Sequence, residues 1–308
     1  MTTLKLFRIG DTHVKELEGH SVIIERSLQT LIEQNLEVML GVKLLDSEYA
    51  IKNDKQSKIN TIGLDENGSP VIIMYQRALN ENIIHQGLYY LDWLTDHRAN
   101  FELLVFKRLG KEYAETIYWP NSRLICIAGD FSKYDRHAIR QISRNIELIQ
   151  YRQFDIGFLL LELISSSIES DSIESYDSQS IISINNKTPD QKALIELLKK
   201  SNKNLFDLFE ALKSFLIALG DDVKQKNLIS YSAFKRLKNF ACIMIPVEID
   251  RLLIYINLPS ETVSPKAGLI RNVERALHVG TGDIEITLKK SEDLDKIRPL
   301  IIKSYENC

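Results

Sequence analysis

A serine-rich, acidic stretch interrupts this 308-residue chain just past its middle. Residues 165–186 contain nine serines, four acidic residues and no Lys or Arg. Such a stretch buries too little apolar area to offset the conformational entropy that folding costs. We therefore predict two domains, at residues 1–164 and 189–308, joined by a linker at residues 165–188.

The rest of the composition is typical of a folded globular protein, with 44% hydrophobic and 26% charged residues. No apolar run approaches the roughly 18 residues that a membrane-spanning helix needs. The first twenty residues carry charges and lack the hydrophobic core of a signal peptide. These features predict a cytoplasmic protein without a membrane partner.

The N-terminal domain alternates between helical and strand patterns. Residues 21–40 repeat apolar side chains at helical spacing, with Ser21 as a candidate N-cap and Gly41 as a candidate C-cap. Two apolar runs then flank the turn-rich hexapeptide DENGSP at 65–70, which predicts a hairpin. Helices are expected at 80–97, with Asn80 as a candidate cap, and at 110–118 and 133–146, and strands at 101–106, 123–129, 146–154 and 157–165. This order predicts an α/β fold with one mixed sheet and helices on its faces.

The C-terminal domain has fewer elements and a different charge. Residues 187–308 contain 20 basic and 16 acidic residues, which leaves a small positive excess. We expect a broken helix over 189–219, strands within 240–249, 251–258 and 282–290, and a closing helix over 291–306. This order predicts a smaller α+β domain.

The predicted hairpin brings three unusual side chains together. Alternation along its second strand puts Met74 and Gln76 on one face, and antiparallel pairing sets Asn60 opposite Met74 or Tyr75. An amide, a thioether and a second amide are poor ligands for a hard divalent cation. The place where the three side chains are expected to converge is therefore chemically unsuited to bind Mg²⁺.

Residues 58–77 read KINTIGLDENGSPVIIMYQR, and residues 86–90 read QGLYY. Together they resemble the predicted nucleases related to endonuclease NucS, in which the first stretch is close to RIDTLxxDExGxxVIIEYKR and a helix carries QGxxY. The resemblance runs from about 25 to 163 and implies a restriction-endonuclease-like fold of the PD-(D/E)xK class. It places the family's aspartate, glutamate and lysine at Asn60, Met74 and Gln76, and all three differ.

The resemblance leaves some residual site positions open. In the family an acid from the first helix can complete the metal shell, and both Glu33 and Glu25 are candidates for that acid here. The alternative is that both are surface glutamates without that role. Glu48 is a further candidate for a relocated ligand. Gln86 has either a packing role or a phosphate contact, and Lys58, Arg77 and Arg98 are candidate nucleic-acid contacts.

Aromatic residues and the C-terminal domain complete the resemblance. Tyr89, Tyr90 and Trp93 either stack on bases or pack on the sheet, because they recur at helical spacing. The stretch 234–306 resembles an uncharacterised domain that is often appended to these predicted nucleases. That resemblance implies a fold and an association with nuclease-like domains, but it implies no catalytic activity.

Three functions follow as hypotheses. The first is a catalytically degenerate nuclease-fold protein that needs no cofactor and binds nucleic acid, with DNA favoured over RNA, or supports an active nuclease partner. The second is an active endonuclease that uses Mg²⁺ or Mn²⁺ held by relocated carboxylates such as Glu33 or Glu48. The third is a protein-interaction module whose partner is another protein or a second copy of the chain.

Overall fold

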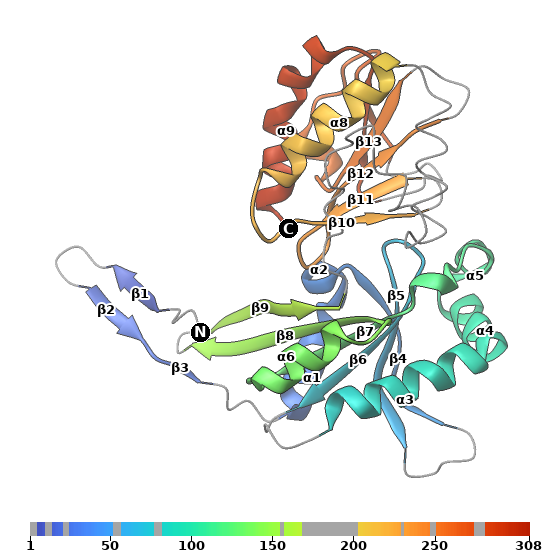
Figure 1. The fold of residues 1–308 in the computed structure, drawn as a ribbon, viewed down its shortest axis with the longest axis vertical. Helices are drawn as coiled ribbons and strands as arrows, with labels where there is room; N and C mark the ends of the chain where they lie inside the picture. Colours follow the sequence, from blue (N-terminus) through green and yellow to red (C-terminus); the bar gives the residue numbers. More distant parts are fainter. Residues whose placement is uncertain are drawn as a thin grey trace. The chain divides into compact units, whose positions relative to one another are not determined.

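The structure is a computed structural model, drawn in Figure 1, and it divides into two compact units, Met1–Glu169 and Ser170–Cys308. The dividing point falls inside the stretch predicted as a linker, and we describe each unit by itself. The described residues are 5–9, 14–20, 25–51, 57–76, 82–154, 157–167, 203–228, 231–246, 251–273 and 281–308.

The N-terminal unit is built on a seven-stranded sheet in the order β3-β8-β7-β6-β5-β4, with β9 paired to β8 (Figure 1). The central strands β6, β7 and β8 run parallel, and the other pairs are antiparallel. The predicted mixed sheet is therefore confirmed. Its strands are β3 Gly19–His20, β4 Val42–Ala50, β5 Lys58–Asp65, β6 Pro70–Gln76, β7 Arg123–Ala128, β8 Asn145–Phe154 and β9 Phe158–Ser166.

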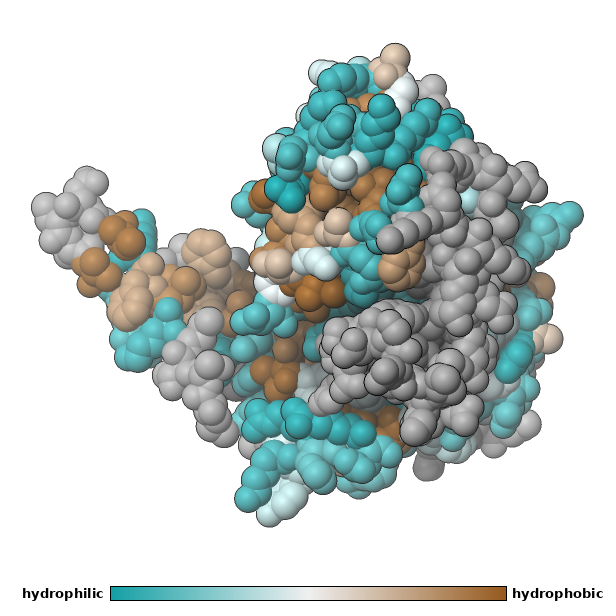
Figure 2. Space-filling model, turned by 45° about the horizontal axis from the view of Figure 1, so that its top comes forward, coloured by the Kyte–Doolittle hydropathy of each residue, from teal (hydrophilic) through white to brown (hydrophobic). Residues whose placement is uncertain are grey.

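Helices accompany this sheet, and a separate ribbon precedes it. The ribbon is a two-stranded sheet of β1 and β2, and its side chains Phe7, Ile9 and Val14 are exposed. Figure 2 shows the surface coloured by hydropathy, with hydrophobic residues on the projecting arm. The elements are β1 Leu6–Ile9, β2 Val14–Leu17, α1 Glu25–Gln34, α2 Leu36–Leu40, α3 Ile83–Asp96, α4 Arg98–Leu109, α5 Lys111–Glu115, η1 Trp119–Asn121 and α6 Lys133–Arg140.

The helix predicted over 21–40 is present as two helices that meet at Asn35. Leu28, Ile32 and Leu36 are buried from it, as their spacing predicts. Gly41 ends α2 with a left-handed φ of 64°, a conformation that favours glycine, so the predicted C-cap is confirmed. The candidate caps Ser21 and Asn80 lie outside the described residues.

The strand predicted at 101–106 is wrong, because those residues belong to α4. Phe101 and Val105 are buried four residues apart on one helix face, while Leu103 and Phe106 are exposed on the other. A short apolar run shows no clear periodicity, so its sequence does not distinguish a strand from a helix, and tertiary packing favours the helix here. The edge strand β4 was not predicted, because its sequence VKLLDSEYA mixes charges with apolar residues.

The predicted hairpin is confirmed as β5 and β6, with Leu64 opposite Pro70 and Thr61 opposite Ile73. The Oδ1 atom of Asp65 closes its turn by accepting hydrogen bonds from the main-chain nitrogens of Asn67 at 2.9 Å and Ser69 at 2.8 Å. The carboxylate of Asp65 thus accepts hydrogen bonds from two main-chain nitrogens of the turn.

The C-terminal unit is a six-stranded antiparallel sheet in the order β10-β11-β12-β13-β15-β14, with α8 and α9 packed on one face (Figure 1). The strands within 240–249, 251–258 and 282–290 and the closing helix are confirmed, whereas β10, β11 and β14 were not predicted. Of the helix expected over 189–219, residues 189–202 lie outside the described part. The elements are β10 Lys224–Asn227, β11 Tyr231–Lys235, β12 Asn239–Met244, β13 Leu252–Ile256, β14 Ile270–Asn272, β15 Ile284–Leu288, α8 Lys203–Ile217, α9 Leu294–Glu306, and the short η3 Ser260–Thr262 and η4 Ser291–Asp293.

Within the described residues, no helix is both long and apolar enough to cross a membrane.

Candidate functional site

One face of β6 is apolar and packs against α3. Met74 is 4% exposed and belongs to the same buried cluster as Tyr90 and Leu91 of α3. Gln76 is also buried, and its parallel partner Ala128 is part of that cluster, so Gln76 shares this face. Two of the three positions that the sequence singled out therefore point into the side of the sheet that carries the hydrophobic core.

The third position, Asn60, uses its side chain to end a strand pairing. The regular ladder between β5 and β6 stops at Thr61 and Ile73. One residue further, the side-chain Oδ1 of Asn60 accepts a hydrogen bond from the main-chain nitrogen of Tyr75 at 3.5 Å. The amide thus takes the place of a main-chain acceptor, which is a structural use of an oxygen that an aspartate would offer to a metal.

The opposite side of this strand pair carries a polar cluster around Glu33, which is half-buried on α1. Its Oε1 accepts hydrogen bonds from the hydroxyl of Thr61 at 2.5 Å, the hydroxyl of Ser47 at 2.8 Å and the Nε2 of Gln29 at 3.0 Å. All three donors are uncharged. We call this set, with Glu48 and Tyr75, the Glu33 network.

Gln29 is the hub of the network. Besides Glu33, its Nε2 lies 3.2 Å from Oε1 of Glu48 and 3.1 Å from the main-chain oxygen of Asn60, both within hydrogen-bonding distance. Glu48 has a φ of 53°, which non-glycine residues adopt rarely and at a cost of about 1–3 kcal/mol. Consecutive strand residues normally face opposite ways, yet here Ser47 and Glu48 both reach Gln29.

Tyr75 joins β6 to the network from the same side. Its hydroxyl is hydrogen-bonded to that of Thr61 at 3.3 Å. Burial raises the pKa of Tyr75, and the negative charge of Glu33 raises it further, so the phenol stays neutral. The network therefore contains two carboxylates and several neutral donors. Sequence reasoning missed Gln29, Ser47, Thr61 and Tyr75, because their partners are 14 to 31 residues away in the chain.

A buried ion cluster lies on the same side, nearer the hairpin turn. Arg123 contacts Asp65 at 3.0 Å and Glu147 at 2.8 Å, and all three side chains are at most 4% exposed. Burial alone would lower the pKa of Arg123, but the two carboxylates more than reverse this and raise it, so the guanidinium is charged. Asp65 is thus committed to the turn and to Arg123, and is not a substitute metal ligand.

The divalent cation that the family resemblance implies does not fit the residues present. Met74 offers a thioether inside a core, Asn60 has its oxygen in a main-chain hydrogen bond, and Gln76 is a neutral amide. Glu33 is already surrounded by neutral donors. No group of three or more His, Cys, Asp or Glu side chains in the described ranges is placed to hold a metal ion.

The predicted nucleic-acid contacts that the structure describes lie on three different elements. Lys58 is exposed at the start of β5, Gln86 is exposed on α3, and Arg98 is exposed at the start of α4. The guanidinium of Arg98 lies 5.1 Å from the centre of the Trp119 ring. Arg77 falls outside the described residues.

The aromatic residues of α3 divide between surface and core. Tyr89 is 52% exposed, whereas Tyr90 is buried and Trp93 packs against Tyr49 and His97. Gly87 lies where a side chain would collide with Leu124 of β7, since an added Cβ would come within 2.5 Å of it. The QGLYY stretch therefore places a glycine and a tyrosine against the sheet and leaves Gln86 and Tyr89 facing solvent.

Comparison with known sequences adds two likenesses. Residues 196–307 match a family described as "Domain of unknown function (DUF5655)", which bears out the likeness of the C-terminal part to a domain without assigned chemistry. An uncharacterized protein of Haemophilus influenzae is 27% identical over 316 residues, covering 99% of this chain and 100% of that protein.

Two solved structures are also similar over part of the chain. A repair endonuclease from Pyrococcus abyssi matches with a TM-score of 0.28 and 18% identity, over 42% of this chain and 47% of that one. The EndoMS-dsDNA2 complex matches with a TM-score of 0.25 and 19% identity, over 46% and 49%. The matched part is thus about half the length of each solved chain.

Proposed function

We propose that the N-terminal unit is a nuclease-like domain of the PD-(D/E)xK class that has lost its metal site. It acts by binding nucleic acid, with DNA favoured over RNA, or by supporting an active nuclease partner. The observation that carries this proposal is Met74, which lies 4% exposed in the hydrophobic core at the position where the resemblance expects a glutamate ligand.

The other two positions support the same reading. A nuclease of this class needs anionic oxygens to hold the ion and a cation nearby to stabilise the developing charge. Asn60 supplies a neutral oxygen that is already hydrogen-bonded, and Gln76 supplies no charge. Because ligands and lysine act as a unit, the loss of all three removes the chemistry rather than weakening it.

Nucleic-acid binding is supported by cations that have no acidic partner nearby. Lys58, Arg98 and Lys107 are exposed, and none of the three makes an ion pair within the described part of the chain. Such side chains gain most from phosphates, whose condensed counterions they release. Exposed Tyr89 offers a ring on which a base can stack.

A second candidate is the active nuclease with relocated ligands, favoured by one observation. Glu33 and Glu48 both lie within hydrogen-bonding distance of the same nitrogen of Gln29, at 3.0 and 3.2 Å, so their carboxylates are close together. However, the two carboxylates share the side-chain nitrogen of Gln29, which occupies the position between them that a metal ion would need. We therefore rank this candidate second.

One experiment separates the two candidates. The purified full chain is incubated with plasmid, single-stranded DNA and RNA in the presence of Mn²⁺, and its binding to each polymer is measured at several salt concentrations. We expect binding that weakens as salt rises, and no cleavage. Cleavage that disappears in Glu33→Ala or Glu48→Ala would establish the second candidate, and absence of binding at low salt would remove the nucleic-acid role.

A further inference from the structure

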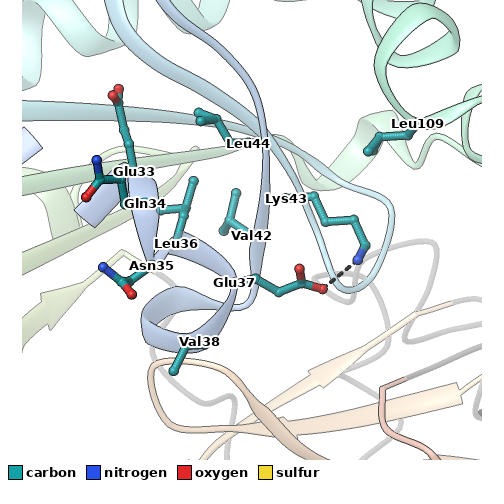
Figure 3. A pocket seen from close by; sticks show the side chains of 10 residues that line it. All are labelled: Glu33, Gln34, Asn35, Leu36, Glu37, Val38, Val42, Lys43, Leu44 and Leu109. Carbon is teal, nitrogen blue, oxygen red and sulfur yellow. Dashed lines mark hydrogen bonds and ion pairs between the residues drawn. The ribbon is translucent and has the colours of Figure 1, made fainter. Parts of the chain in front are cut away.

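A pocket of about 430 Å³ opens beside β4, at one end of the N-terminal sheet (Figure 3). Its walls come from the α1–α2 junction, the first residues of β4 and the end of α4. Glu33 stands at one side, and the apolar lining consists of Leu36, Val38, Val42, Leu44 and Leu109. We call this surface the β4 pocket.

The rim of the pocket exposes apolar side chains to water. Val38 is 72% exposed and Leu44 is 39% exposed. On α4, Phe106 is 52% exposed and precedes Leu109 by three residues, which places the two on neighbouring turns of one face. Apolar residues from three elements therefore surround one hollow, and clustered exposure of this kind marks an interaction site.

The floor of the pocket belongs to an edge strand. The strand order of the sheet ends at β4, which pairs only with β5 in the part of the chain that the structure describes. Main-chain groups on the outer side of such a strand are a template for another extended segment. The residues Val42, Lys43 and Leu44 thus belong both to a strand edge and to a pocket whose lining mixes five apolar residues with Glu33, Gln34, Asn35, Glu37 and Lys43.

The charges around the pocket are unequally balanced. Glu37 is paired with Lys43 at 2.5 Å, shown as a dashed line in Figure 3. Glu33 has only neutral donors, and neither it nor Glu48 makes an ion pair with any described residue. One side of the pocket therefore carries negative charge that a cation from outside would complement.

We propose that the β4 pocket binds an extended segment of a partner protein. The segment adds to the edge of β4, places aliphatic or aromatic side chains along the lining residues Val38, Leu44 and Leu109, and brings an Arg or Lys to Glu33. A guanidinium fits best, because its planar fork matches a carboxylate with two parallel hydrogen bonds. Of the cations proposed to bind nucleic acid, Lys58 and Arg98 do not line this pocket, and Lys107 lies on α4 two residues before the lining residue Leu109, so competition between DNA and the peptides tells the two proposals apart.

A protein segment suits the pocket better than nucleic acid. The lining carries two carboxylates, Glu33 and Glu37, against one cation, Lys43, and this excess of negative charge disfavours a phosphodiester chain. A strand edge, in contrast, forms main-chain hydrogen bonds with any extended peptide, and the hollow gives selectivity for one of its side chains.

The test uses random twelve-residue peptides displayed on phage and selected on the full chain. We expect the selected peptides to share an apolar residue next to Arg or Lys. Their affinity, measured by fluorescence polarisation of labelled synthetic peptides, should fall roughly tenfold in Leu44→Asp. Glu33→Gln should lower it less, and should remove most of its dependence on salt.

Val38→Asp keeps the test decisive if Leu44→Asp does not fold, because Val38 is 72% exposed and its replacement leaves the core untouched. Tyr134→Asp is the matched control, since Tyr134 is also 72% exposed but lies on α6. The proposal would be overturned if the selection gave no binders. It would also be overturned if the peptides bound Leu44→Asp and Val38→Asp as tightly as they bind the wild type. A DNA duplex that competes with the peptides for this surface would overturn it as well.

Discussion

The two faces of β6 are both lined with buried aliphatic residues, Ile72 on one and Val71 and Ile73 on the other, but they differ toward the end of the strand. Toward α3, Ile72 and Met74 lie in a hydrophobic cluster. Toward α1, Tyr75 joins a network of hydroxyls, amides and carboxylates, and Arg123 anchors an ion cluster. The strand thus has a thioether in a hydrophobic cluster where the resemblance expects a ligand, and a tyrosine in a polar network on the other side.

This difference shows what became of the expected site. On the face where the resemblance expects a metal, Met74 lies in a hydrophobic cluster. The remaining acid on α1, Glu33, is on the other side of the sheet and is held by Ser47, Thr61 and Gln29. A carboxylate held by neutral donors is organised, but it has no second ligand set with which to share an ion.

The largest effect on the polar face should come from Arg123→Leu. Removing one partner leaves Asp65 and Glu147 buried without their cation, which costs about 3–5 kcal/mol of unfolding free energy. Both tryptophans, Trp93 and Trp119, are in the N-terminal unit, so their fluorescence during urea unfolding follows that unit in the full chain.

Arg144→Leu is the matched control for this change. Its ion pair with Asp92 has a similar length of 2.7 Å but is about half exposed. Exposed pairs contribute about 0–1 kcal/mol, so the control should shift the unfolding midpoint little. Equal losses in the two variants would show that the ion cluster is not the anchor of the polar face.

On the apolar face, Met74→Glu should cost about 3 kcal/mol at neutral pH, because it places a carboxylate among Tyr90 and Leu91 without a partner. The buried carboxyl would have a raised pKa, so the loss should shrink as pH falls and the group becomes protonated. Met74→Leu preserves the volume and should cost less than about 1.5 kcal/mol. The measurement is urea unfolding at pH 7 and at pH 5.

The same position links stability to activity. Asn60→Asp, Met74→Glu and Gln76→Lys together should restore metal-dependent DNA cleavage if the scaffold still brings the three side chains together, whereas Met74→Glu alone should not. In the combined variant, Mg²⁺ or Mn²⁺ should recover part of the lost stability, because a cation would then pair with the new carboxylates. A triple variant that stays inactive and gains no stability from metal would contradict the expected convergence.

The smallest effect concerns pH and Tyr75. Its pKa is raised by burial, so the folded state holds the proton more tightly than the unfolded state does. The resulting stability is complete below the ordinary tyrosine pKa of about 10, and it is lost as pH rises toward the higher folded value.

Tyr75→Phe removes that titration. Between pH 9 and pH 11 the variant should lose about 1 kcal/mol less unfolding free energy than the wild type. Tyr134→Phe, on an exposed ring of α6, is the control. Identical pH slopes for wild type and Tyr75→Phe would show that the phenol is not part of a closed network.

Much of the fold could be read from local patterns. The hairpin of β5 and β6 followed from two apolar runs around a turn-forming hexapeptide, and Gly41 ended its helix as the spacing indicated. The run at 101–106 could not be assigned in the same way. In its helix, Phe101 and Val105 are buried while Phe106 faces water. The sequence of a short apolar run does not show which of its residues will be buried, so helix and strand could not be told apart.

The amino-acid sequence alone determined that Asn60, Met74 and Gln76 cannot supply two anionic ligands and a cation, because ligand chemistry belongs to the side chain itself. Only the tertiary structure decided that Met74 enters the core and that Glu33 meets Ser47 and Thr61. It also decided that β4, which pairs only with β5 in the described part of the chain, lies beside a pocket. The physical reason is range: strand order and helix docking join residues that are distant in the chain, and no local pattern encodes which face of a strand another element will cover.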